Sequence, residues 1–107
     1  MKFDWKQTLP EPKIGDLRVW HIPQIPGKQF FVPVKDIEQA KLVQDALADY
    51  DLFQLANRIK PDYANASGLM IYEDYGAGPE WIEWYDDEGN GIDDYELFEG
   101  KLILKSE

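Results

Sequence analysis

The alternation of apolar and polar residues predicts short strands near the start of the chain, followed by a helix. Two runs rich in β-branched and aromatic residues, 17–22 and 30–34, are typical of strands. A turn marked by Pro26 and Gly27 separates them. Because Pro33 has no amide hydrogen to donate, the second run is expected at the edge of a sheet.

From Asp36 onward the apolar residues recur every three or four positions, which predicts an amphipathic helix over about 36–50. Asp36 and Gln39 have the spacing of an N-terminal capping box. The residues expected on its buried face are Ile37, Ala40, Val43, Ala46, Leu47 and Tyr50. The residues expected to point into solvent are Lys41, Gln44, Asp45 and Asp49. A short second helix is predicted at about 51–57, with Asp51 as its cap.

The second half of the chain predicts further strands joined by glycine-containing turns, at 68–74, 81–86, 92–98 and 101–105. The pair Asn90–Gly91 suits a primed hairpin turn, so the two runs flanking it are expected to pair. No strand–helix–strand unit repeats. The order therefore favours an α+β domain, an antiparallel sheet of four to six short strands with helices on one side. This domain is expected over 16–107, after an extended arm over 1–15.

Charge is divided unevenly along the chain. Residues 1–60 carry 9 Lys or Arg and 8 Asp or Glu, whereas residues 61–107 carry 2 and 13. Aromatic residues are interspersed among these carboxylates, and disordered acidic segments are poor in aromatics, so a folded acidic surface is expected. The net charge of −10 disfavours nucleic acid, because affinity for phosphates depends on Lys and Arg. It favours a basic protein partner, and solubility alone is the competing explanation.

The expected partner-binding surface combines aromatic anchors with carboxylates, as charged interfaces do. Its residues are Trp81, Trp84, Tyr85, Asp86, Asp87, Glu88, Asp93 and Asp94. A second polar cluster in the loop after the helices is a candidate site for a small ligand. Its residues are Tyr50, Phe53, Asn57, Asp62, Tyr63, Asn65 and Ser67. The alternative for this loop is that its polar side chains satisfy their own backbone.

The sequence offers no catalytic or metal site, so we expect a non-enzymatic protein without a cofactor. His21 is the only histidine, there is no cysteine, and no glycine elbow surrounds a serine, so His21 is expected to be structural. Residues 86–97 resemble a calcium loop only in part, because Asp93 replaces its apolar residue and Leu97 its bidentate glutamate. No apolar run approaches the roughly 20 residues of a membrane span.

Several segments resemble small acidic proteins encoded by bacteriophages and prophages, over about residues 17–92. The matching segments are Phe31–Val34, Ala46–Gln54, Ile59–Ala66, Gly68–Leu69, Trp84–Asp86 and Gly89. This resemblance implies an accessory role in the cytoplasm of an infected bacterium and assigns no catalytic residue. Small acidic phage proteins often bind and block host factors, including restriction and CRISPR enzymes.

From charge and resemblance together, the expected function is to bind and inhibit or modulate a basic host protein, such as a defence nuclease. The contact is expected at the partner-binding surface of carboxylates and aromatic residues described above. Two alternatives remain at this point. One is a ligand-sequestering domain that uses the loop 57–68. The other is an assembly protein that self-associates through a sheet edge, as a homodimer for example.

Overall fold

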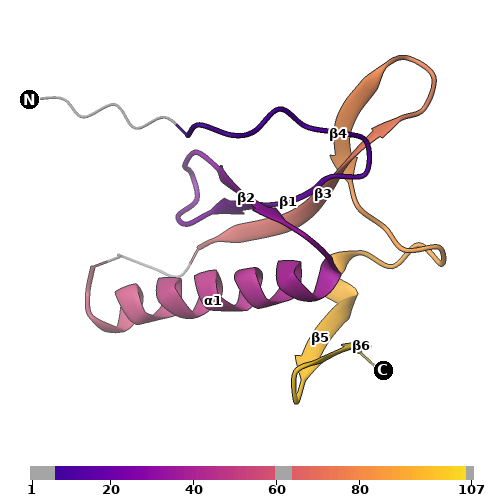
Figure 1. Ribbon diagram of the computed structural model, residues 1–107. Helices are drawn as coiled ribbons and strands as arrows, with labels where there is room; N and C mark the ends of the chain where they lie inside the picture. Colours follow the sequence, from indigo (N-terminus) through magenta and orange to yellow (C-terminus); the bar gives the residue numbers. More distant parts are fainter. Residues whose placement is uncertain (1–6, 60–63, 106–107) are drawn as a thin grey trace, which may run out of the picture.

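The computed structural model describes residues 7–59 and 64–105 and has the predicted α+β architecture. Its elements are β1 (Leu17–Ile22), β2 (Phe30–Val34), α1 (Ile37–Ala56), β3 (Ala66–Asp74), β4 (Pro79–Glu83), a 3-10 turn (Ile92–Asp94), β5 (Tyr95–Phe98) and β6 (Lys101–Leu104). Helix α1 runs along one side of the sheet formed by β1 to β4, and the hairpin of β5 and β6 lies near the start of that helix (Figure 1).

The main sheet is antiparallel, with the strand order β2-β1-β3-β4. Strand β2 lies at an edge, as Pro33 predicts. The side-chain amide of Gln7 covers part of this edge, since it donates to the carbonyl of Phe31 and accepts from the Phe31 amide at 2.7 Å. The Gln7 side chain therefore takes the place that a further strand would occupy at this position.

The core lies between α1 and the sheet face that carries Val19 and Leu69, which are opposite each other in the register of β1 and β3. Val34 of β2, Ala40 of α1 and Ile92 complete the cluster of buried hydrophobic residues. Because side chains alternate along a strand, the neighbouring residues point to the opposite face. That second face carries Arg18, Trp20, Phe31, Tyr72 and Trp81.

The helix begins where the sequence predicts, because the carboxylate of Asp36 accepts from the Gln39 amide at 2.7 Å. Two expectations about its course are wrong. A single helix extends to Ala56, so there is no separate second helix and Asp51 does not cap one. Asp51 is only 2% exposed, in the middle of the packed side of α1.

The predicted inner and outer faces of α1 also need correction. Gln44, expected in solvent, is buried with 6% exposure, whereas Tyr50, expected in the core, is 57% exposed. Ala46 is exposed as well, although Ala40 is buried as predicted. The helix is rotated so that two polar residues face the sheet.

This rotation is explained by polar partners on β1 and β3. The Nε2 atom of His21 lies 2.8 Å from Asp51 Oδ2, and the Asn65 side-chain amide donates to the same oxygen at 2.8 Å. Gln44 donates to the Ser67 hydroxyl at 3.0 Å, and Ser67 stands opposite His21 in the register. Buried polar groups are costly unless they are hydrogen-bonded, so these contacts hold Gln44 and Asp51 on the inner side.

The predicted hairpin around Asn90–Gly91 is also wrong. Strand β4 ends at Glu83 and pairs only with β3, whereas β5 pairs with β6 in a second sheet. The left-handed residue of the connection is Gly89, with φ of +85°, and not Asn90. A primed turn requires left-handed backbone at its central residues, so the Asn–Gly signal does not act as a hairpin here.

We predict that Asp51→Ala lowers the free energy of unfolding by about 3 kcal/mol, because it leaves His21 buried without its partner. Urea denaturation followed by circular dichroism measures this change. The matched control is Asp49→Ala, an exposed carboxylate on the same helix, which should change stability by no more than about 0.5 kcal/mol. Equal effects of the two substitutions would contradict a structural role for the pair.

Candidate functional site

The loop that follows β4 is organised by the carboxylate of Asp86. One carboxylate oxygen accepts from the backbone amides of Glu88 at 2.9 Å and Asn90 at 2.8 Å. The other accepts from the Asn90 side chain at 3.0 Å and from the hydroxyl of Tyr95. A backbone hydrogen bond from the Asp86 amide to the Asn90 carbonyl, 2.8 Å long, closes the loop. The chain is therefore turned by the Asp86 side chain together with this backbone hydrogen bond.

The same hydrogen bonds set the ionisation of both partners. The hydrogen bond from Tyr95, followed by those from the loop amides, lowers the pKa of Asp86 to about 2. The same hydrogen bond to Asp86 raises the pKa of Tyr95 to about 12, because ionising the phenol would break the bond and place a second negative charge beside Asp86. Asp86 is therefore charged, and its hydrogen bonds within the loop hold the loop in place.

Two open hollows flank Tyr85, a residue that is 61% exposed. The larger hollow, about 680 Å³, lies over the ends of β3 and β4 and is lined in part by Glu73, Tyr75, Trp84 and Asp87. The other, about 560 Å³, is lined in part by Trp20, Asp93 and Asp94. Tyr85 and Glu83 line both. We call these two hollows together the acidic aromatic surface.

Most of the predicted partner-binding residues line this surface, but Trp81 and Glu88 do not. Trp81 points to the sheet face away from α1, where its ring centre lies 4.0 Å from the guanidinium carbon of Arg18 and 5.2 Å from the ring of Tyr72. Trp84 lines the larger hollow and also packs against the core and against Tyr95, at 6.0 Å between ring centres. Asp87, Glu88, Asp93 and Asp94 are exposed.

Among the described residues, no Lys or Arg pairs with the carboxylates of this region. From Glu73 to Glu99 the chain contains 11 acidic residues and no Lys or Arg. Throughout residues 7–59 and 64–105, the ion pair within 4.0 Å is His21–Asp51, and no Lys or Arg pairs with a carboxylate. Partial burial raises the pKa of Glu83, and the neighbouring Trp20 side chain opposes this rise. The surface therefore has a concentrated negative potential that the described residues do not neutralise.

The described residues of the candidate ligand loop do not gather around one site. Asn65 and Ser67 are hydrogen-bonded to Asp51 and Gln44 inside the fold, which agrees with the structural alternative for these two. Tyr50 and Phe53 stack on the outer side of α1, 6.4 Å apart between ring centres, and the Asn57 side chain donates to the Phe53 carbonyl at the helix end. Asp62 and Tyr63 lie outside the described residues.

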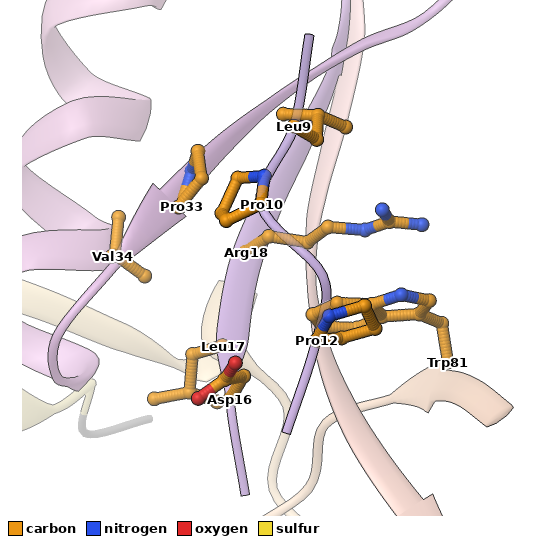
Figure 2. Close-up of a pocket in the computed structure, with 9 residues that line it drawn as sticks. All are labelled: Leu9, Pro10, Pro12, Asp16, Leu17, Arg18, Pro33, Val34 and Trp81. Carbon is orange, nitrogen blue, oxygen red and sulfur yellow. The ribbon is translucent and has the colours of Figure 1, made fainter. Parts of the chain in front are cut away.

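Sequence reasoning missed a pocket of about 170 Å³ on the far side of the sheet. Figure 2 shows Pro10 and Pro12 of the N-terminal segment lying over Arg18 and Trp81. The guanidinium carbon of Arg18 also lies 3.8 Å from the ring centre of Phe31, so two aromatic rings flank this cation. Its one signal in the sequence is Arg18, which stands between two apolar residues in β1. The N-terminal segment itself is joined to the sheet by the hydrogen bonds between Gln7 and Phe31 and by the bond from the Gly15 amide to the Tyr72 carbonyl, 2.8 Å long.

No group of three or more His, Asp or Glu side chains among residues 7–59 and 64–105 is arranged to hold a metal ion. In that same part of the chain, α1 is not long and apolar enough to cross a membrane, and neither is any other helix.

Comparison with known proteins relates the chain to bacteriophages. The sequence model of the family described as superinfection exclusion gene product 17 matches residues 16–102. A curated protein, the superinfection exclusion protein of Salmonella phage P22, is 50% identical over 78 residues, which cover 64% of this chain and 76% of that protein. No solved structure matches the chain. The phage relationship expected from the sequence segments is confirmed.

We predict that the Asp86 carboxylate titrates with a midpoint near 2 in the wild type, as its pKa of about 2 requires. Because the folded-state pKa lies below the ordinary 3.8, this carboxylate stabilises the loop above about pH 4 and loses that effect as pH falls through about 2. Tyr95→Phe should raise the midpoint towards 3.8, whereas Tyr85→Phe should leave it unchanged. Carboxyl-carbon NMR titration measures both, and equal midpoints in wild type and Tyr95→Phe would refute the contact.

We predict that salt stabilises the protein, because no Lys or Arg among residues 7–59 and 64–105 pairs with the carboxylates of its acidic surface. Raising NaCl from about 50 to about 500 mM shortens the Debye length from roughly 14 to roughly 4 Å, which screens repulsion between carboxylates. The melting temperature should therefore rise. In Asp87→Lys with Asp93→Lys the rise should be smaller, since two repulsive charges are reversed. A melting temperature that falls with salt would mean that the carboxylates are paired after all.

Proposed function

This chain belongs to the superinfection exclusion gene product 17 family, and from that membership we propose that it hinders a second phage from infecting a bacterium that already carries the first. The Salmonella phage P22 relative is named for this effect. We further propose that the protein acts without catalysis, by binding a basic host protein or a basic protein of the incoming phage. The family relationship supports the biological role, and the acidic aromatic surface supports the mode of action.

The observation that carries the proposed binding mode is the uncompensated charge around Tyr85. Eleven carboxylates lie between Glu73 and Glu99 without a Lys or Arg among them. Bringing like charges together opposes folding, so a surface of this kind is expected where the charge serves association. A basic partner would relieve the repulsion, and attraction at a distance would accelerate encounter.

Tyr85 is the proposed anchor of this contact. It is 61% exposed and separates the two hollows, so a partner side chain could enter on either side of its ring. Interface hot spots are enriched in aromatic residues that are surrounded by groups which exclude water. Glu73, Asp87, Asp93 and Asp94 would supply the surrounding charge.

A small-ligand function is the weaker proposal. Asn65 and Ser67, two of the residues on which it depends, are engaged in hydrogen bonds within the fold. An anionic ligand would also meet a chain of net charge −10. We therefore place the function at the acidic aromatic surface.

The test is phage exclusion by bacteria that express each variant. Asp87→Lys with Asp93→Lys should restore plating of the superinfecting phage, because the negative field around Tyr85 is reversed on both sides. The matched control is Glu11→Lys with Asp49→Lys, which makes the same change in net charge at exposed positions that line neither hollow and lie outside residues 73–99.

Tyr85→Ser should also weaken exclusion, since it removes the proposed anchor and leaves the charge unchanged. All variants are compared at equal abundance and with native circular dichroism. Full exclusion by both the Asp87/Asp93 variant and Tyr85→Ser would refute the proposed binding surface. If only the control variant lost exclusion, the contact with the partner would lie outside the two hollows.

A further inference from the structure

The outer side of α1 carries large apolar residues that nothing in the described part of the chain covers. Leu42 is 60% exposed, and Tyr50 and Phe53 are each 57% exposed. Ala46, between them, is exposed as well. An isolated exposed leucine is ordinary, but adjoining apolar side chains on one helix face indicate a contact surface.

These four residues form one continuous stripe, because they are spaced at i, i+4, i+8 and i+11. At 3.6 residues per turn they fall within an arc of about 80° around the helix axis. The rings of Tyr50 and Phe53 are nearly parallel, at 13°, so that end of the stripe presents a broad apolar surface. We call Leu42, Ala46, Tyr50 and Phe53 the α1 stripe.

The other end of the stripe opens into a groove between α1 and the β5–β6 hairpin. Leu42 and Leu97 line this groove, which has a volume of about 330 Å³ and is also bordered by Lys35 and Glu38. An apolar side chain of a partner could therefore enter between Leu42 and Leu97 while the rest of the partner follows the helix.

The stripe faces outward because of contacts on the inner side of α1. Gln44 and Asp51 are held towards the sheet by Ser67, His21 and Asn65. Turning the helix to bury Tyr50 would pull these polar groups away from their partners. These contacts therefore keep the stripe on the outer side of α1.

The charge along the stripe distinguishes between candidate partners. Glu38, Asp45 and Asp49 border one side of it, and the only basic residue within α1 is Lys41. Among the described residues, no Lys or Arg lies within 4.0 Å of these carboxylates. A second copy of the chain would set the same carboxylates, and the same net charge of −10, against each other. A basic amphipathic segment would pair with them.

We propose that the α1 stripe is a docking surface for an amphipathic helix of another protein, with apolar residues along one side and Lys or Arg beside them. The apolar residues would lie on Leu42, Tyr50 and Phe53, with one entering the groove at Leu97. Because the carboxylates border only one side of the stripe, they would fix the direction of the partner helix. This surface is separate from the one around Tyr85 and does not depend on it.

The test uses the full chain and a synthetic helical peptide of about 18 residues, long enough to form about five turns, with Leu at i, i+3, i+4 and i+7 spacing and Lys beside them. A matched peptide carries Glu in place of Lys. In NMR titrations the Lys peptide should shift the amide signals of α1 and of the residues around Leu97, and the Glu peptide should bind much more weakly.

Tyr50→Ser with Phe53→Ser should weaken binding about tenfold or more, as expected for the loss of two aromatic anchors. The matched control is Leu52→Ser, because Leu52 is 52% exposed on the same helix but lies outside the stripe. It should leave affinity within about twofold, which is less than one typical hot-spot effect. Asp45→Lys with Asp49→Lys should reverse the preference towards the Glu peptide. All variants should retain native circular dichroism.

Several results would overturn the proposal. One is that the Lys peptide does not bind at about 1 mM, the weak end of specific association. Another is that Leu52→Ser weakens binding as much as Tyr50→Ser with Phe53→Ser does. A third is that the Lys and Glu peptides bind with equal affinity. Shifts confined to Tyr85 and its hollows would refute the α1 stripe while supporting the surface of the proposed function. A dimer in sedimentation that dissociates on Tyr50→Ser with Phe53→Ser would make a second copy the occupant instead. Phage exclusion does not enter these measurements, so failure of that role would leave them interpretable.

Discussion

The buried contact between His21 and Asp51 determines how α1 lies on the sheet, and much of the molecular surface follows from it. A carboxylate and an imidazole that are both withdrawn from water need each other, since either one alone would be a costly buried polar group. Asn65 adds a third member from the approach to β3. The pair thus connects the first strand, the helix and the segment after the helix, which are far apart in sequence. Core packing alone would have favoured a different rotation, with Tyr50 inside.

The sequence predicts those parts of the fold that depend on local signals. Strands β1 and β2 have the predicted bounds, and Asp36 caps α1, because alternation and capping are properties of neighbouring residues. The helix faces could not be predicted in the same way. The periodicity of apolar residues predicts which helix face is buried, but it does not take account of His21. That residue lies thirty positions before Asp51 in the sequence and draws it to the inner side. The Asn90–Gly91 signal failed for a similar reason, since the Asp86 carboxylate and its bond to Tyr95 shape that loop.

The sequence predicts which types of residue form the candidate site, but not how those residues are arranged in space. Carboxylates among aromatic residues were visible in the sequence, and most of them do lie around Tyr85. The strand alternation that takes Trp81 to the opposite face could be read only once the strand and its partners were known. The α1 stripe was not predicted, because two of its four residues, Ala46 and Tyr50, were expected on the buried face of the helix. Two surfaces of one chain therefore combine negative charge with apolar contact area.

The Gln7 side chain at the edge of β2 limits how copies of this protein could join. A β-sheet with two open edges can be extended indefinitely, each added copy offering a fresh edge to the next. Here the amide of Gln7 already holds both backbone groups of Phe31, so the outer strand β4 is the edge left for pairing in the main sheet. Edge-to-edge pairing through β4 would close with two-fold symmetry and stop at two copies, and growth into a filament would first require the N-terminal segment to detach.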